Sequence, residues 1–183
     1  MDPFETLLDI ERNCKAYALN IPRQIVTERD WLGIGFRLAN CNFVSRMRSV
    51  SEILRWPSMS TVPNAELWFK GIANLRGRIL PITDLQGFVT SNPHKESSLS
   101  RILVIHFEEA FYGFAVEQVL GIERFFGEEV KPAEGLIELK DYMPYVQGAF
   151  ERDQKPWIIM DFEKLIQDPD FYHILASKVE VNN

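Results

Sequence analysis

The sequence predicts an all-β protein made of two related β-subdomains, with a short helix near each end of the chain. Three observations favour this fold class. Apolar and polar residues alternate with a period of two from Ile34 to Leu38, as in a strand with one buried face. Residues 68–85, WFKGIANLRGRILPITDL, have the pattern of strand, tight turn and strand. The pattern then recurs in the second half of the chain, which indicates an internal repeat.

Residues 1–30 differ from the rest of the chain and predict an N-terminal helical extension. Asp2 is a suitable helix cap, Pro3 suits the first helical position, and the helix is expected to end before Pro22. Its apolar residues have helical spacing: Phe4, Leu7, Leu8, Ile10, Cys14 and Tyr17. Such a stripe either covers the body of the domain or forms a dedicated docking helix.

The central hairpin places charged residues at a tight turn. Gly77 can adopt the positive φ that a hairpin turn requires, and Asn74 can bond to the nearby backbone. Arg76 and Arg78 therefore lie at the tip, between strands that contain Leu80 and other apolar residues. These arginines are either ordinary solvated charges or part of a recognition surface on a rigid support.

The repeat and one polar loop define the expected domain boundaries. Residues 90–100, TSNPHKESSLS, read as an exposed loop. It separates a first β-subdomain at about 31–90 from a second at about 101–162. Several positions match across the loop at offsets of 69 and 77 residues: Ile34 with Leu103, Phe36 with Ile105, Leu38 with Phe107, Gly71 with Gly148, and Asp84 with Asp161. Closing each unit into a barrel would remove its exposed strand edges.

The C-terminal part reads as helix. Residues 162–166 predict a first turn or two, and Asp168 followed by Pro169 is a cap and first-position signal for a last segment. We expect residues 168–183 to form a C-terminal helix and tail, in which Phe171 covers the open side of a barrel.

Composition fits a compact globular protein and disfavours several function classes. The 183 residues are 46% hydrophobic and 25% charged, with a net charge of −6 and no basic block that would indicate a nucleic-acid surface. No apolar run is long enough to insert into a membrane, and the N-terminus lacks a secretory signal pattern. Cys14 and Cys41 are isolated, which favours reduced thiols in the cytoplasm over a disulfide.

Catalytic and metal-binding patterns are lacking in the sequence. His94, His106 and His173 have no second ligand at metal-binding spacing, so no metal or cofactor is expected. Asp84 and Asp161 end matching strands, where they are either turn formers or the carboxylate pair of a small hydrolase. The many aromatic residues, including Trp31, leave an oligonucleotide-binding barrel as another alternative. Core filling is the simpler explanation, and we expect no enzyme activity.

The central run KGIANLRGRILPITDL resembles the signature of the CheW-like chemotaxis coupling proteins. The similarity extends over residues 31–167, and the runs PFETLLDIERNC and WLGIGF resemble the twitching-motility branch of that family. This resemblance implies two small five-stranded, SH3-like β-barrels packed together.

The resemblance also implies a receptor-binding surface. Glu52 and Arg76 match two family residues that pair beside a groove between the barrels, where a chemoreceptor tip binds. Apolar residues of that surface correspond to Met47, Val50 and Ile53, although strand alternation predicts that some of these three belong to the core. Lys70 and Arg78 either add a basic rim or are solvated hairpin charges. The motif does not place the kinase contacts, which remain unknown.

The expected function is therefore a non-enzymatic adaptor. It would couple the cytoplasmic tip of a methyl-accepting chemoreceptor to the regulatory domain of a CheA-type histidine kinase, in the cytoplasm at membrane-associated chemosensory arrays. Resemblance to the twitching branch points to control of type IV pili, and a flagellar chemotaxis coupler is the alternative within the same fold.

Overall fold

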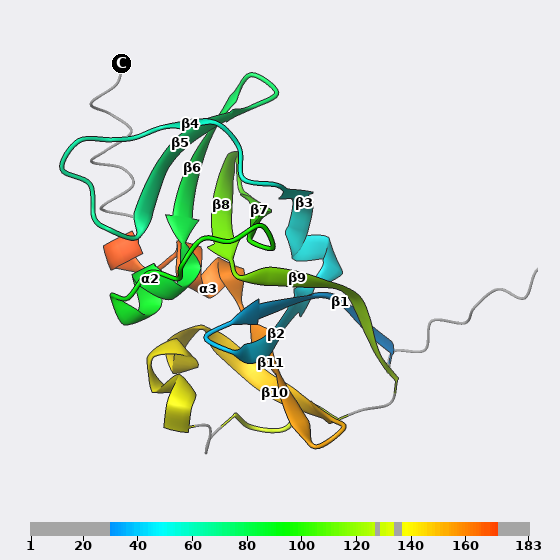
Figure 1. The fold of residues 1–183 in the computed structure, drawn as a ribbon. Helices are drawn as coiled ribbons and strands as arrows, with labels where there is room; N and C mark the ends of the chain where they lie inside the picture. The colour runs from blue at the N-terminus through cyan, green and yellow to red at the C-terminus, as the bar shows by residue number, and fades with distance from the viewer. Residues whose placement is uncertain (1–29, 127–128, 134–136, 172–183) are drawn as a thin grey trace, which may run out of the picture.

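The computed structural model describes residues 30–126, 129–133 and 137–171. Its body consists of two β-sheets (Figure 1). The first sheet has five strands in the order β10-β11-β2-β1-β9. Their bounds are Asp30–Leu38 for β1, Cys41–Arg46 for β2, Gln118–Phe126 for β9, Val146–Arg152 for β10 and Lys155–Met160 for β11.

The second sheet has six strands in the order β3-β7-β8-β6-β5-β4. Their bounds are Val50–Leu54 for β3, Met59–Ser60 for β4, Phe69–Leu75 for β5, Arg78–Asp84 for β6, Arg101–Phe107 for β7 and Ala110–Val116 for β8. Short helical segments accompany the sheets, among them η1 (Met47–Ser49), α2 (Leu85–Thr90), η2 (Ile137–Tyr145) and α3 (Phe162–Ile166). The predicted all-β class with few short helices is confirmed.

Helix predictions have mixed outcomes. The helix expected at 162–166 is α3, and residues 169–171 are helical after Asp168, whose Oδ1 accepts a hydrogen bond from the Asp170 N–H (2.9 Å). Helical segments α2 and η2 were not predicted from the sequence. The predicted N-terminal helix and the residues after Phe171 lie outside the described part of the chain.

The structure confirms the internal repeat. Hairpin β1–β2 corresponds to β7–β8 at an offset of 69 residues, and hairpin β5–β6 corresponds to β10–β11 at an offset of 77. The β5–β6 and β10–β11 hairpins each have a register shift near the start of the first strand. In each, the shift lies at a glycine of positive φ, Gly71 at 141° and Gly148 at 150°. An isolated bridge from Lys131 to Ala149 corresponds to the pairing of Ser60 with Ile72 in the other sheet.

The two repeats exchange their first hairpins. Strands β1 and β2 join the sheet of β9, β10 and β11, whereas β7 and β8 join the sheet of β3, β5 and β6. Parallel pairings of β2 with β11 and of β8 with β6 complete the exchange. The sheets therefore do not coincide with the predicted contiguous subdomains at 31–90 and 101–162, because η1 and Glu117 each carry the chain from one sheet to the other.

One large hydrophobic core joins the two sheets. It combines Phe36 of β1 and Phe114 of β8 with Phe162 of α3, all fully or almost fully buried. The four tryptophans fill this core and two smaller clusters, with Trp68 and Trp157 buried and Trp31 and Trp56 partly buried. Core filling thus accounts for their number. Within the described residues, no helix is long and apolar enough to cross a membrane.

Candidate interaction surface

The β5–β6 hairpin ends in a two-residue turn, Arg76-Gly77, which projects at the top of Figure 1. Both residues have positive φ, 53° for Arg76 and 86° for Gly77, as in a type I′ turn. The Gly77 N–H donates a hydrogen bond to Asn74 Oδ1 at 2.7 Å. The left-handed region is conformationally costly for a non-glycine residue. The surrounding hairpin therefore has to hold the Arg76 backbone in this conformation.

Arg76 and Glu52 form an ion pair that connects the hairpin tip to edge strand β3. The distance from Arg76 Nη2 to Glu52 Oε2 is 3.0 Å, and the side chains are 80% and 27% exposed. An exposed pair of this kind contributes only about 0–1 kcal/mol to stability. Its main effect is to orient a planar guanidinium whose remaining N–H donors point to solvent.

Two of the three apolar residues expected at this surface are exposed. Met47 in η1 is 45% exposed and Ile53 in β3 is 42% exposed. Val50 instead packs against the main core, and a register shift separates it from Glu52 in the pairing of β3 with β7. This division agrees with the expectation that some of the three residues belong to the core.

The other two hairpin cations, Lys70 and Arg78, lie in different surroundings, Lys70 partly buried and Arg78 exposed. Lys70 is near the start of β5, and its Nζ is 3.5 Å from Asp84 Oδ2, with the side chain 18% exposed. The structure therefore does not bring Lys70 together with Arg76. The Arg78 guanidinium lies 5.0 Å from the centre of the Phe111 ring.

Asp84 lies at the centre of a buried polar cluster. Its Oδ1 caps α2 by accepting a hydrogen bond from the Gly87 N–H (2.8 Å), and His94 Nδ1 lies 2.9 Å from its Oδ2. Burial raises the pKa of Asp84, but the His94 contact, the Gly87 N–H and the charge of Lys70 outweigh it, so the net shift is downward. Sequence reasoning missed His94, which occupies a polar loop with no local signal of burial.

Asp161 has an equivalent but simpler role. Its Oδ1 caps α3 by accepting from the Lys164 N–H (3.1 Å), and its Oδ2 accepts from Gln147 Nε2 (2.7 Å). Each aspartate of the suggested hydrolase pair thus has a structural function as a helix cap. Among the described residues, no three side chains of the His, Cys, Asp and Glu types gather into a metal-binding group.

The other sheet also has an Arg–Glu pair that joins its hairpin to an edge strand, although at positions that are not equivalent by the repeat offsets. Arg152, at the end of β10, bonds Glu123 of edge strand β9 at 2.8 Å and also donates to the backbone carbonyl of Arg124. Its guanidinium lies 4.0 Å from the centre of the buried Phe125 ring. Sequence reasoning missed this pair, and the repeat offsets do not indicate it, because they match Arg76 with Asp153 and Glu52 with Gly121.

The aromatic-rich run 122–126 of β9 contributes to both the core and the surface. Phe125 is fully buried, whereas Ile122 and Phe126 are 61% and 59% exposed. The run therefore includes core filling together with an exposed apolar edge beside the second Arg–Glu pair.

Comparisons with known proteins agree with this architecture. Residues 32–170 match the CheW-like domain family. The chain is 35% identical over 176 residues to Protein PilI of Pseudomonas aeruginosa, covering 94% of this chain and 96% of that protein. It is 26% identical to the chemotaxis protein CheW of Klebsiella aerogenes, covering 74% of this chain and 81% of that one.

A solved structure shares the fold. The crystal structure of the scaffolding protein TtCheW from Thermoanaerobacter tengcongensis superposes with a TM-score of 0.65 at 23% identity, covering 76% of this chain and 94% of the other. Together with the family match, these similarities show that the chain belongs to the CheW-like family, a family of non-enzymatic scaffold and coupling proteins.

Proposed function

We propose that this protein is the adaptor that couples a methyl-accepting chemoreceptor to a CheA-type histidine kinase in a cytoplasmic chemosensory array that controls type IV pilus twitching. The observation that carries this proposal is the oriented Arg76–Glu52 pair at the hairpin tip. Its presence at the family's signature positions supports a receptor-binding role for the surface.

The surface has the chemistry of a small recognition site. Arg76 offers directional donors for carboxylates or helix-end carbonyls of a receptor tip. Exposed Met47 and Ile53 supply apolar contact area beside it, and methionine adapts readily to different partner shapes. Val50 supports this surface from the core side. Lys70 supports the surface indirectly, because it forms an ion pair with Asp84 of the same hairpin.

A scaffold protein in an array can function even when each of its contacts with a partner is weak. One surface would bind the receptor tip while another binds the kinase regulatory domain, whose contact residues we leave unassigned. Linking many such contacts in an array raises the effective concentration of each partner. The 35% identity with Protein PilI supports the twitching assignment over flagellar chemotaxis.

Binding measurements with Arg76 variants test the proposal. Arg76→Ala should weaken binding to a receptor-tip fragment by about 2 kcal/mol or more, because a central interface arginine is often a dominant contact. Arg76→Lys should restore binding only partly, since an ammonium lacks the planar fork. Glu52→Ala should cause a smaller loss through misorientation of Arg76. Titration of the purified proteins, with a thermal melt for each, gives these values.

Two controls separate a local effect from a general one. Lys155→Ala removes an exposed cation from the equivalent hairpin of the other sheet and should leave receptor binding unchanged. Kinase binding should stay near the wild-type value in all variants. Wild-type receptor affinity in a folded Arg76→Ala protein would refute the proposal. In the native bacterium, the same substitution should reduce twitching and not swimming.

A further inference from the structure

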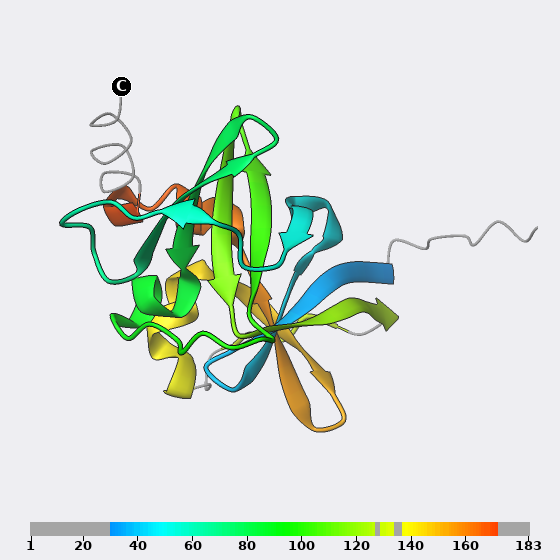
Figure 2. The ribbon, with the colours of Figure 1, turned by 45° about the horizontal axis from the view of Figure 1, so that its top comes forward.

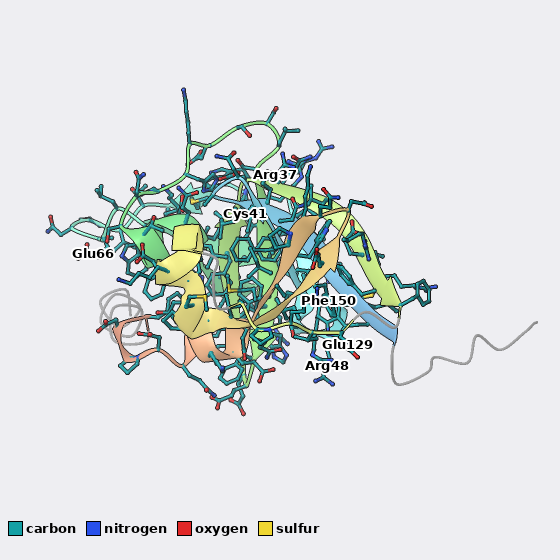
Figure 3. The ribbon with its side chains drawn as sticks, turned by 90° about the horizontal axis from the view of Figure 1, so that it is seen from below. Arg37, Cys41, Arg48, Glu66, Glu129 and Phe150 are labelled. Carbon is teal, nitrogen blue, oxygen red and sulfur yellow. The ribbon has the colours of Figure 1, made fainter. Side chains whose placement is uncertain are left out.

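A cleft of about 460 Å³ lies on the other side of the molecule from the Arg76 surface. It is formed by the loop before β5, helix α2, segment η2 and the residues after α3. Figures 1 and 2 show α2 and β3 on opposite sides of the molecule, and in Figure 3 Glu66 at the cleft lies far from Arg48 of η1. The lining residues are Glu66, Trp68, Phe88, Val89, Asp141, Tyr145 and Asp170.

The floor of the cleft is aromatic and held in place by packing. The Phe88 ring lies 5.1 Å from Trp68 and 6.2 Å from Tyr145. Buried Phe171 contacts both Trp68 and Phe88 from below. The Tyr145 hydroxyl donates to Asp168 Oδ2 at 2.8 Å. Rings fixed in this way can bind an apolar side chain at little entropic cost.

The rim of the cleft is acidic. Glu66, Asp141 and Asp170 are exposed, and no Lys, Arg or His is among the lining residues. In the part of the chain that the structure describes, none of these three carboxylates forms a salt bridge. Beside them, Leu67 is 80% exposed, so the apolar area extends past the cleft edge.

An apolar floor with an acidic rim selects for one kind of occupant. An acidic segment would be repelled, and a purely apolar segment would leave the carboxylates without a cation to pair with. A helix with a basic face and an apolar face would match both features, because aromatic grooves commonly bind amphipathic helices.

We propose that this cleft docks a basic amphipathic segment of a partner protein. An apolar side chain of the segment rests on Phe88 and Val89, and a lysine or arginine lies among Glu66, Asp141 and Asp170. This interaction surface goes beyond the proposed receptor coupling, because it lies on a different face. Its carboxylates favour a basic partner, whereas Arg76 favours an acidic one.

Amide chemical shifts of the full-length protein, measured by NMR during peptide titration, test this proposal. The probe is a short amphipathic peptide of leucine and lysine, and the matched probe replaces every lysine with glutamate. The lysine peptide should shift the amides of Leu67, Phe88 and Val89, and the glutamate peptide should shift none of them. Leu67→Ser, a change at a largely exposed position, should weaken binding of the lysine peptide.

Charge variants distinguish a specific site from general attraction to an acidic protein. Neutralising the rim with Glu66→Gln, Asp141→Asn and Asp170→Asn together should weaken binding by about fivefold, since each exposed ion pair contributes modestly. The matched triple Glu96→Gln, Glu108→Gln and Glu109→Gln changes exposed carboxylates elsewhere and should have less than about a twofold effect. Equal losses in the two triples, or shifts scattered away from the cleft, would overturn the proposal.

Discussion

Replacing Asp84 with alanine removes a carboxylate that is fully buried and has three partners. The change leaves His94, with a side chain only 2% exposed, and Lys70 without an anion, and it leaves the Gly87 N–H without its cap. Removing one member of a buried ionic cluster costs roughly 3–5 kcal/mol, and a lost helix cap costs about 1 kcal/mol. Since these effects overlap, we expect a loss of about 4 kcal/mol in the free energy of unfolding.

Asp161 is the matched control because it caps α3 at the equivalent position of the repeat. It bonds one backbone N–H and one amide side chain, and it forms no salt bridge with any residue in the described ranges. Asp161→Ala should therefore cost about 1 kcal/mol. For a chain of this size each kcal/mol lowers Tm by about 2–4 °C. Thermal melts should show a drop of roughly 8–16 °C for Asp84→Ala and about 2–4 °C for Asp161→Ala. Equal drops would refute the reasoning.

The same cluster gives a pH dependence with a definite sign. The net shift lowers the pKa of Asp84 in the folded protein below its ordinary value of 3.8. Its charge therefore stabilises the fold above that pH, and the stabilisation is lost as pH falls further through the folded pKa. Asp84→Asn keeps a cap and removes the charge. The stability advantage of wild type over Asp84→Asn should shrink as pH falls below about pH 4.

Two further predictions concern the β5–β6 hairpin. Leu80 is fully buried beside Ile82 in the second core cluster, so Leu80→Ala should cost about 2–5 kcal/mol in a denaturant titration; an unchanged midpoint would contradict the core assignment. Gly71 has a φ of 141°, and an added Cβ would lie 2.4 Å from the Ser60 carbonyl oxygen, so Gly71→Ala should cost roughly 1–3 kcal/mol or more. Gly77 has open space around it, so Gly77→Ala should cost less, and the reverse order would contradict this account.

Local features of the fold were predictable from the sequence. The Asn74 and Gly77 turn chemistry, the period-two strands and the Asp168 cap each depend on residues a few positions apart. The repeat was visible because equivalent strands keep the same spacing between apolar residues. Leu80 and Ile82 are two positions apart and share one face of β6, so strand alternation accounts for the burial of both. Pro81 between them is also buried, so β6 is covered on both faces.

The pairing of distant strands was not predictable in the same way. A strand has the same alternation whether it pairs within its own repeat or with the other one, so the exchange of hairpins between repeats left no local signal. The Arg76–Glu52 pairing came from family resemblance, since 24 residues and several strands separate the two side chains.

The two Arg–Glu pairs differ in how exposed their guanidinium groups are. Each pair joins a hairpin to the edge strand that faces it, yet Arg76 is 80% exposed while Arg152 is 26% exposed. Arg152 donates hydrogen bonds to Glu123 and to a backbone carbonyl, and its guanidinium lies over a buried ring. These interactions are all made within the fold. Within the part of the chain that the structure describes, Arg76 forms one side-chain hydrogen bond, from Nη2 to Glu52. The exposure of the guanidinium, and not the presence of an ion pair, is therefore the reason to assign recognition to the first hairpin and stability to the second.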